Sequence, residues 1–340
     1  MIKLHYFYRH PHAIYFSVEK LFKAVSSEIS STYPDEFILS GIFLPFTSKL
    51  KTLLKNIKFV SRHQATINHI TGDTHYVIAG CNKKNINIVT IHDCVVLRKY
   101  SVMDPRYRFI KWLWYDMPVR KADAVTVISE NTKKELLHFT HCDPDKIKVI
   151  RNFIDPAFQP SAAVFNETRP RILFIGSTPN KNLDRLIESM QGIQADLDIV
   201  GHITDEQGKK LTRYNIHYDQ SSGLTREELL AKYKQCDLLA FPSTYEGFGL
   251  PIIEAQAIGR PVLTSDLPPM NEVAGLGACL ADPFDIASIR NGLLRIIEDA
   301  AYRESLISKG FENVERFKLS EVTKQYVSLY HELLQKKKLG

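Results

Sequence analysis

Short, almost entirely apolar runs separated by segments of helical period constrain the fold of this chain more than any other feature. Two examples are INIVTI at 86–91 and RILFIG at 171–176. Such runs are typical of strands buried on both faces of a parallel sheet, with helices as the crossover connections, so the pattern predicts an α/β fold. We expect strands at 36–43, 75–79, 86–91, 123–128, 146–150, 171–176, 196–200, 237–241, 262–265 and 278–281. We expect helices at 17–29, 130–139, 181–190, 225–234, 250–258, 285–299, 301–316 and 320–336.

The chain reads as two α/β halves joined by a linker. Its length of 340 residues suits two domains. Residues 151–170 carry three prolines and little periodicity, which favours a linker there. We expect domains at 1–155 and 156–318, followed by a helix with a basic tail at 319–340. Open parallel sheets bind ligands beyond the carboxyl ends of their strands, so the site is expected in a cleft between the two domains.

The positive charge of the chain lies in its first half. The formal net charge is +6, but residues 1–155 hold 23 Lys and Arg against 14 Asp and Glu, a net +9. This asymmetry indicates a negatively charged partner for that half, which could be nucleic acid, an anionic membrane surface or an anionic substrate.

The cysteines and the N-terminus bear on the compartment. Five widely spaced cysteines without a C-x-x-C pair favour a reducing cytoplasm and argue against a structural zinc site. His63, His69 and His75 are evenly spaced, which fits neither a helical face nor a known ligand pattern, so we expect no metal site. The start of the chain is charged and contains prolines, so we expect no signal peptide. The sequence contains no run of eighteen apolar residues, so we expect no membrane-spanning helix.

One segment, DLLAFPSTYEGFGLPIIEAQAIGRPVLTS at 237–265, predicts a strand, a loop, a helix and a second strand. Pro251 suits the first turn of the helix, and Gly259 suits its C-terminal end. Gly247 and Gly249 let the backbone approach a ligand closely. The free N–H groups at the helix start favour an anion such as a phosphate.

Two glutamates belong to this segment, Glu246 in the loop and Glu254, which we expect in the first helical turn. Each alone has a plainer interpretation. Glu254 could complement the helix dipole, which is worth about 0.3–1 kcal/mol, and Glu246 could be a solvated loop residue. A carboxylate beside an anion site is also suited to accepting hydrogen bonds from sugar hydroxyls. Together with the glycines and the strand-loop-helix context, the pair favours this second interpretation.

The stretch PSTYEGFGLPIIEAQAxGRPV resembles the signature of retaining glycosyltransferases of the GT-B fold, family 4 or glycosyl transferases group 1, which includes many bacterial mannosyl-, glucosyl- and rhamnosyltransferases of surface-polysaccharide synthesis. Two glutamates separated by seven residues are the hallmark of that family. Further segments resemble it in the usual order, namely HITGDTHY at 69–76, TIHD at 90–93, VISENTKKEL at 127–136, KVIRNFID at 148–155, IGSTPNKNL at 175–183 and PPMNEVAG at 268–275. The resemblance implies two Rossmann-like domains facing a central cleft, with the C-terminal helix packing back on the first domain.

The resemblance also assigns roles to residues at matching positions. Glu246 would contact the transferred sugar, Glu254 would hold the ribose hydroxyls of the nucleotide, and Lys181 would clamp the diphosphate. His92 would approach the donor sugar from the first domain, so His92 and Glu246 are the expected catalytic residues. The expected donor-binding residues are Gly176, Ser177, Thr178, Asn180, Lys181, Ser243, Gly247, Phe248, Gly249, Leu250 and Glu254.

Two positions depart from the family pattern. Many members carry an arginine after the strand glycine, where this chain has Ser177, so the phosphate clamp has one fewer charge. Many members have a glycine-rich loop after the first strand, where this chain reads YRHPH at 8–12. Arg9 and His10 are therefore candidates for acceptor contacts. Asp93 is a third candidate, which could instead orient the neighbouring imidazole.

The implied reaction moves a hexose, expected to be mannose, from a GDP- or UDP-sugar to a glycan or lipid-linked oligosaccharide with retention of configuration. The helix start at 249–251 and Lys181 would stabilise the charge on the leaving diphosphate, which can replace a catalytic metal. We therefore expect no metal and no cofactor. The implied enzyme is cytoplasmic, acts in polysaccharide or lipopolysaccharide synthesis, and is held at the inner face of the membrane by its basic first domain.

Two other functions stay open at this point. Sugar-nucleotide epimerases share the two-domain fold but lack the glutamate-pair signature. A nucleic-acid-binding protein is the other, because residues 98–121 mix Arg and Lys with Trp112, Trp114 and Tyr115, as stacking grooves do. Residues 49–62 carry leucines at helical spacing beside lysines, which suits either a membrane-facing surface or a core stripe with a solvated face.

Overall fold

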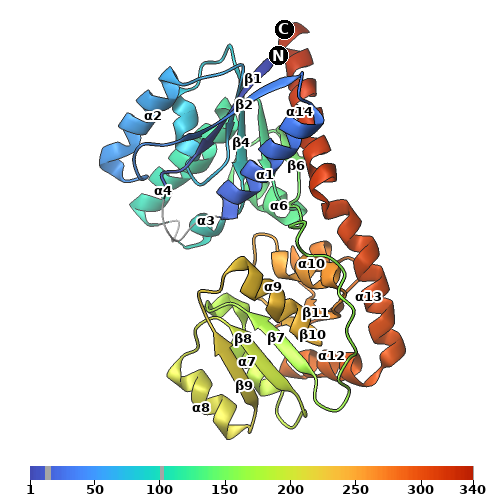
Figure 1. Ribbon diagram of the computed structural model, residues 1–340. Coiled ribbons are helices and arrows are strands. Elements are labelled where there is room, and N and C mark those ends of the chain that lie inside the picture. Colours follow the sequence, from blue (N-terminus) through green and yellow to red (C-terminus); the bar gives the residue numbers. More distant parts are fainter. Residues whose placement is uncertain (12–16, 100–102, 340) are drawn as a thin grey trace. The chain divides into compact units, whose positions relative to one another are not determined.

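The computed structural model of the protein describes residues 1–11, 17–99 and 103–339. His12 of the loop at 8–12 and residues 100–102 of the segment 98–121 lie outside the described residues. The chain forms two compact units, Met1–Phe153 with Leu319–Gly340, and Ile154–Lys318 (Figure 1). Each unit has its own six-stranded sheet, so the predicted α/β architecture with two parallel sheets is confirmed.

The sheet of the first unit has the strand order β2-β1-β3-β4-β5-β6, and every neighbouring pair is parallel. Side chains of β1 alternate between two cores, with Tyr6 and Tyr8 on one face and Phe7 on the other. Burial on both faces explains the high share of apolar side chains in these strands. The strands are β1 (Ile2–Tyr8), β2 (Phe37–Phe43), β3 (Ile67–Ile70), β4 (Ile86–Ile91), β5 (Ala124–Val127) and β6 (Ile147–Val149).

The C-terminal helix α14 (Leu319–Leu339) packs beside α1 (Ser17–Thr32) in the first unit, which confirms the expected return of this helix (Figure 1). The hydroxyl of Tyr330 lies 2.9 Å from Nδ1 of His69, and Nε2 of His69 lies 2.7 Å from Oγ1 of Thr90. Burial lowers the pKa of His69 to about 3, so this ring is neutral and serves the packing of α14. The other helices of this unit are α2 (Leu53–Arg62), α3 (Val95–Lys99), α4 (Pro105–Lys111), α5 (Met117–Lys121) and α6 (Glu130–Phe139).

The sheet of the second unit has the order β12-β11-β10-β7-β8-β9 and is also parallel throughout. Its strands are β7 (Arg171–Ile175), β8 (Asp196–Val200), β9 (His217–Ser221), β10 (Leu238–Phe241), β11 (Val262–Ser265) and β12 (Cys279–Ala281). Its helices are α7 (Leu183–Ser189), α8 (Asp205–Arg213), α9 (Arg226–Gln235), α10 (Leu250–Ile258), α11 (Met270–Ala274), α12 (Ile286–Glu298) and α13 (Ala300–Val314). From β7 the chain adds strands outward to β9, then returns to β10 and adds strands on the other side. The order therefore reverses between β7 and β10.

One predicted strand was wrong, and three strands of the structure, β1, β3 and β9, were not among those predicted. The run predicted as a strand at 75–79 is a 3-10 turn, η2 (His75–Gly80), whose apolar side chains are buried without sheet pairing. Strand β3 was not predicted because its sequence, INHI, contains two polar residues that are nevertheless fully buried. Strand β9, HYDQS, was not predicted because it is an edge strand whose side chains are mostly exposed.

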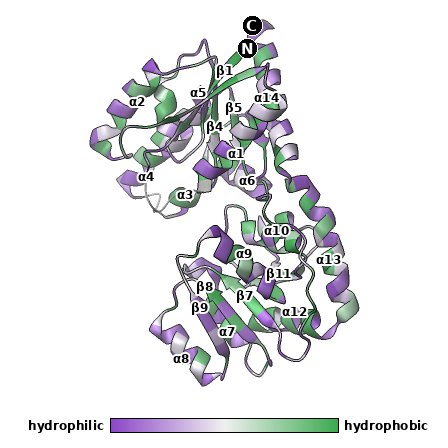
Figure 2. Ribbon diagram, viewed as in Figure 1, coloured by the Kyte–Doolittle hydropathy of each residue, from purple (hydrophilic) through white to green (hydrophobic). Residues whose placement is uncertain are grey.

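The helices are mostly amphipathic, and Figure 2 shows hydrophilic and hydrophobic residues alternating along α14 and α2. In the segment 49–62, Leu53 is buried, whereas Leu50 and Leu54 are 73% and 77% exposed. In the aromatic segment 98–121, Tyr115 is buried and Trp112 is half exposed. Among the described residues, no helix combines the length and the apolar character that crossing a membrane requires.

Candidate active site

Two loops of the second unit form the candidate site, 176–182 after β7 and 242–249 after β10. The strands β7 and β10 are paired neighbours, and the order of the sheet reverses between them. Open α/β sheets bind ligands beyond the carboxyl ends of their strands at such a reversal, because the loops diverge there and leave space. Most of the residues predicted to bind the donor lie on these two loops.

Hydrogen bonds tie the two loops together. Nδ2 of Asn180 donates to the carbonyl oxygen of Tyr245 at 2.8 Å, and the backbone N–H of Thr244 donates to the carbonyl of Asn180 at 2.7 Å. Asn182, buried and in the left-handed region with φ of 68°, donates from Nδ2 to the Pro242 carbonyl at 3.0 Å. Asparagine tolerates this backbone conformation better than most residues. The site is therefore fixed by side chains that reach from the first loop to the backbone of the second.

Lys181 and Glu246, predicted separately, meet at the centre of these loops. Nζ of Lys181 lies 2.7 Å from Oε1 of Glu246, and the two side chains are 20% and 14% exposed. The ammonium also lies 4.7 Å from the ring centroid of Phe241, within the range of a cation–π contact. Gly176, with φ of 137°, makes room for this lysine, since a Cβ at that position would collide with its Cγ.

The N-terminus of α10 adjoins the second loop. Its N-cap residue is Gly249, with φ of 109° and no side-chain cap, and Pro251 lies in the first turn as predicted. The neighbouring Phe248 is buried against the ring of Phe317 at a centroid distance of 5.8 Å. Ser243 is fully buried, and its Oγ has no hydrogen-bond partner among the residues described. Uncapped N–H groups and an unpartnered hydroxyl are what an oxyanion ligand requires of a site.

Glu254 lies in the second turn of α10, so its expected place in the first turn was wrong. The helix begins at Leu250, which makes Glu254 its fifth residue. Burial raises the pKa of Glu254 to about 6. The hydroxyl of Tyr233 on α9 donates to Oε2 of this carboxylate at 2.6 Å. No local sequence pattern indicates this contact, because the two residues belong to separate helices.

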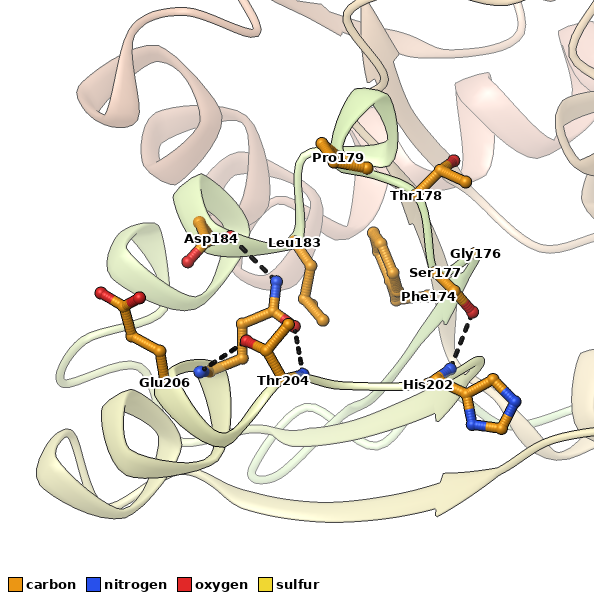
Figure 3. Close-up of a pocket in the computed structure, with 11 residues that line it drawn as sticks. Phe174, Gly176, Ser177, Thr178, Pro179, Leu183, Asp184, His202, Thr204 and Glu206 are labelled. Atoms are coloured by element: carbon orange, nitrogen blue, oxygen red, sulfur yellow. Dashed lines mark hydrogen bonds between the residues drawn. The ribbon is translucent and has the colours of Figure 1, made fainter.

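A pocket of about 220 Å³ lies beside the first loop (Figure 3). Ser177 and His202 line one end of it, and Asp184 and Glu206 line the other. Oγ of Ser177 accepts a hydrogen bond from the backbone N–H of His202 at 2.7 Å, which leaves its own proton to donate. Thr178 belongs to the same wall. The two hydroxyls at the position of the missing arginine therefore border open space.

His92 belongs to the first unit, directly after β4. Its Nε2 donates to the carbonyl of Thr71 at 3.1 Å, which leaves Nδ1 as an acceptor. Burial is the main cause that lowers the pKa of His92, so the ring is neutral at neutral pH. The Thr71 carbonyl thus orients the imidazole. Asp93, considered for that task, instead accepts from the backbone N–H of Val95 at the start of α3, at 3.1 Å.

The two basic residues expected at the acceptor site are engaged within the first unit. The Arg9 guanidinium donates from Nε to Glu19 Oε1 at 2.7 Å and lies 3.9 Å from Asp73. Nδ1 of His10 lies 3.2 Å from the Leu44 carbonyl oxygen. Both side chains therefore hold the loop after β1 in place.

Within the described ranges 1–11, 17–99 and 103–339, no three His, Cys, Asp or Glu side chains are grouped as metal ligands are. Two pairs of aspartates separated by one residue occur in the sequence, Asp143 with Asp145 and Asp196 with Asp198, and each pair makes hydrogen bonds within the fold. Asp143 caps a 3-10 turn by accepting from the backbone N–H of Asp145, and Asp198 accepts from Lys232 at 2.9 Å.

The two halves of the chain match two family models in order. Residues 27–158 match Glycosyltransferase Family 4, and residues 157–313 match Glycosyl transferases group 1. The chain is 26% identical over 278 residues to the serotype-specific mannosyltransferase WbdA of Escherichia coli, covering 73% of this chain and 34% of WbdA. It is 27% identical over 236 residues to the O-antigen chain mannosyltransferase RfbU of Salmonella typhimurium, covering 66% of this chain and 63% of RfbU.

The chain spans about a third of the length of the first of these relatives. Among solved structures, it superimposes on HepE of Anabaena in complex with UDP and glucose with a TM-score of 0.75 and 14% identity, covering 97% of this chain and 100% of HepE. That likeness shows that the fold is shared. With both halves matched in sequence and the paired glutamates at the expected loop and helix, the chain belongs to the GT-B glycosyltransferases of glycosyl transferases group 1.

Proposed function

We propose that the protein is a retaining glycosyltransferase that moves a hexose from a nucleoside diphosphate sugar to a glycan or lipid-linked oligosaccharide. The Lys181–Glu246 pair, held between two hydrogen-bonded loops beside the uncapped start of α10, carries this proposal. A diphosphate needs a cation and N–H donors, and a sugar needs a carboxylate acceptor. These groups lie within one pair of adjoining loops.

The departing nucleoside diphosphate would be stabilised by groups of this chain alone. Lys181 supplies a full positive charge, and the helix N-terminus supplies N–H groups and the positive end of the dipole. Ser177 and Thr178 add hydroxyl donors where many relatives have an arginine. Such stabilisation of the developing charge is the largest contribution to many enzymatic rates, and it makes a metal unnecessary in the proposed reaction.

The two catalytic candidates have complementary chemistry. Glu246 would accept hydrogen bonds from hydroxyls of the transferred sugar. A neutral His92, with its Nε2 proton committed to the Thr71 carbonyl, would accept a further one at Nδ1. Neither residue needs to act as a general base, because the departing phosphate can take the proton of the acceptor on the same face of the sugar. That arrangement is compatible with retention of configuration.

We propose a mannose donor and a surface-polysaccharide acceptor. WbdA and RfbU bear names that describe mannosyltransferases, and RfbU is named for the O-antigen chain. HepE was solved with UDP and glucose, so a UDP-sugar belongs in any donor panel beside the GDP-sugars.

The test is a panel of GDP- and UDP-sugars with a lipid-linked oligosaccharide acceptor, monitored by release of the nucleoside diphosphate and by the anomeric configuration of the product. The expected result is acceptor-dependent release with one donor, lost in Glu246→Ala. If no donor supports release with any acceptor, the proposal fails. Conversion of a donor to its epimer without acceptor would instead indicate a sugar-nucleotide epimerase.

We also propose that the first unit attaches to the inner face of the membrane. Leu50 and Leu54 are exposed beside Lys51 and Lys55, an arrangement suited to insertion among anionic headgroups. Co-sedimentation with vesicles containing an anionic lipid at low salt should pellet the protein, and the double variant Leu50→Asp, Leu54→Asp should stay in solution. A wild-type protein that fails to pellet but binds RNA in a salt-sensitive manner would contradict this proposal.

A further inference from the structure

Tyr233 contacts Glu254 but has no role in the reaction proposed above. It lies on α9, is fully buried, and packs its ring edge-on against Phe158 with the ring centroids 5.4 Å apart. Its hydroxyl lies 2.6 Å from Oε2 of Glu254, which is on α10. A hydrogen bond of this length between a hydroxyl and a carboxylate is of the strong, charge-assisted kind.

The direction of this hydrogen bond follows from the two acidities. Burial and the charge of Glu254 raise the pKa of Tyr233 well above 10, so the phenol keeps its proton at neutral pH. Burial raises the pKa of Glu254 to about 6, and the hydrogen bond from Tyr233 acts in the opposite direction. Tyr233 is therefore the donor, and it favours the ionised carboxylate.

In the part of the chain that the structure describes, no charged group on the helices around α10 contributes to the pKa shift of Glu254. Helices α9, α11 and α13 pack against it. Among the described residues, burial and Tyr233 are the two influences on the pKa of Glu254. No described group donates a hydrogen bond to the second oxygen, Oε1. One oxygen is thus fixed by the protein, and the other retains its capacity to accept.

We propose that Tyr233 is a positioning residue that fixes the Glu254 carboxylate through Oε2, so that Oε1 accepts hydrogen bonds from the ribose hydroxyls of the bound nucleotide. This inference rests on the proposed function, in which Glu254 holds the ribose. It adds that nucleotide affinity depends on a buried phenol which does not touch the nucleotide, and that this dependence varies with pH.

The experiment measures the affinity of UDP and of GDP by calorimetry from pH 5.5 to pH 8.5, with no acceptor and no turnover. In the wild type, affinity should fall as the pH drops through about 6, where Glu254 takes up a proton. In Tyr233→Phe, which loses only the hydroxyl, the same fall should occur about one pH unit higher. The variant should bind about eightfold more weakly than the wild type at pH 5.5, about threefold more weakly at pH 6.5, and within about twofold of the wild type at pH 8.5.

Two further variants separate positioning from folding. Tyr330→Phe removes a buried phenol that contacts His69 and Tyr6 in the first unit, and its pH profile should match the wild type. Glu254→Gln should bind the nucleotides weakly at every pH and show no fall in affinity near pH 6. A profile for Tyr233→Phe that coincides with the wild type, or a loss of affinity equal at all pH values, would overturn the inference.

The outcomes for the inference and for the proposed function are distinct. If Tyr233→Phe shows the expected pH shift in nucleotide binding but the wild type transfers no sugar, the proposed function is contradicted and the inference is not. If the wild type transfers sugar but the pH profile of Tyr233→Phe is unshifted, only the inference is contradicted. A wild type that binds neither nucleotide would overturn both.

Discussion

Glu246 and Lys181 neutralise each other in the absence of ligand, and this has a measurable consequence for nucleotide binding. The ammonium that would hold the diphosphate is 2.7 Å from the carboxylate that would hold the sugar. A nucleoside diphosphate must therefore compete with Glu246 for Lys181, and it also meets the negative charge of that carboxylate. We predict that Glu246→Gln, which removes the charge and keeps the shape, binds UDP or GDP more tightly than the wild type.

The size of the effect can be estimated from the pair. Unit charges 4 Å apart attract by about 4 kcal/mol at the effective dielectric constant of a protein surface. Both side chains are largely shielded, at 20% and 14% exposed, but part of this attraction is offset by their desolvation. A net gain of about 1–2 kcal/mol for the nucleotide remains, in the range measured for hydrogen bonds to charged groups. This corresponds to roughly fivefold to thirtyfold tighter binding.

The assay is titration calorimetry with the nucleoside diphosphate that the active donor releases, at low and at high salt, beside the rate of sugar transfer. Glu246→Gln should bind more tightly while transfer falls about 100-fold or more, as for loss of one group that stabilises the transition state. Glu167→Gln is a matched control, because it removes the carboxylate of another ion pair of this unit, with Arg303 at 2.8 Å. Equal or weaker nucleotide binding by Glu246→Gln would refute the reasoning.

Three predictions concern stability. The pKa of Glu254 rises from 4.5 to about 6 on folding, so the folded state binds a proton more tightly than the unfolded state does. The free energy of unfolding therefore falls as the pH rises through this interval. Glu254→Gln should raise Tm by a few degrees at pH 7.5 and not at pH 4.5 in thermal scans. Asn182→Ala should cost about 2–4 kcal/mol by denaturant unfolding, since it loses buried hydrogen bonds to the Pro242 and Pro283 carbonyls at 3.0 and 2.7 Å, whereas Asn182→Gly should cost less because glycine accepts the backbone conformation. Deleting residues 319–340 should unfold the first unit, since burial of the apolar face of α14 is worth about 10 kcal/mol or more; limited proteolysis should then degrade that unit and spare the second.

The fold was predictable from the sequence wherever a strand is buried on both faces. Such a strand is mostly apolar, as in β4 (INIVTI) and β7 (RILFI), and this pattern can be recognised without knowing which strands pair with it. The prediction failed where burial and polarity disagree. The Asn68 amide of β3 is buried because Asn87 on β4 accepts from it at 3.0 Å, and no local pattern indicates that partner. The apolar run of η2 is buried by packing against α2 and α5 without a sheet.

The sequence was enough to predict which residues belong to the candidate site, but it was not enough to predict the contacts between them. Spacing placed Glu246 in a loop and Glu254 in a helix, and the start and end of α10 followed from Pro251 and Gly259. The contact between Tyr233 and Glu254 joins two helices separated by a strand, so only the packed structure brings them together. The same holds for the Asn180 amide that ties one loop to the other.

The return of α14 to the first unit also sets an order for folding during synthesis. The last strand of the first sheet ends at Val149, but the helix that covers part of that sheet begins at Leu319. The ribosome therefore completes the whole second unit, Ile154–Lys318, before the first unit has all of its parts. Until α14 emerges, the first sheet has apolar side chains without their cover, and such surfaces promote aggregation. The first unit, although most of it is translated first, is thus the last to have all of its parts available for folding.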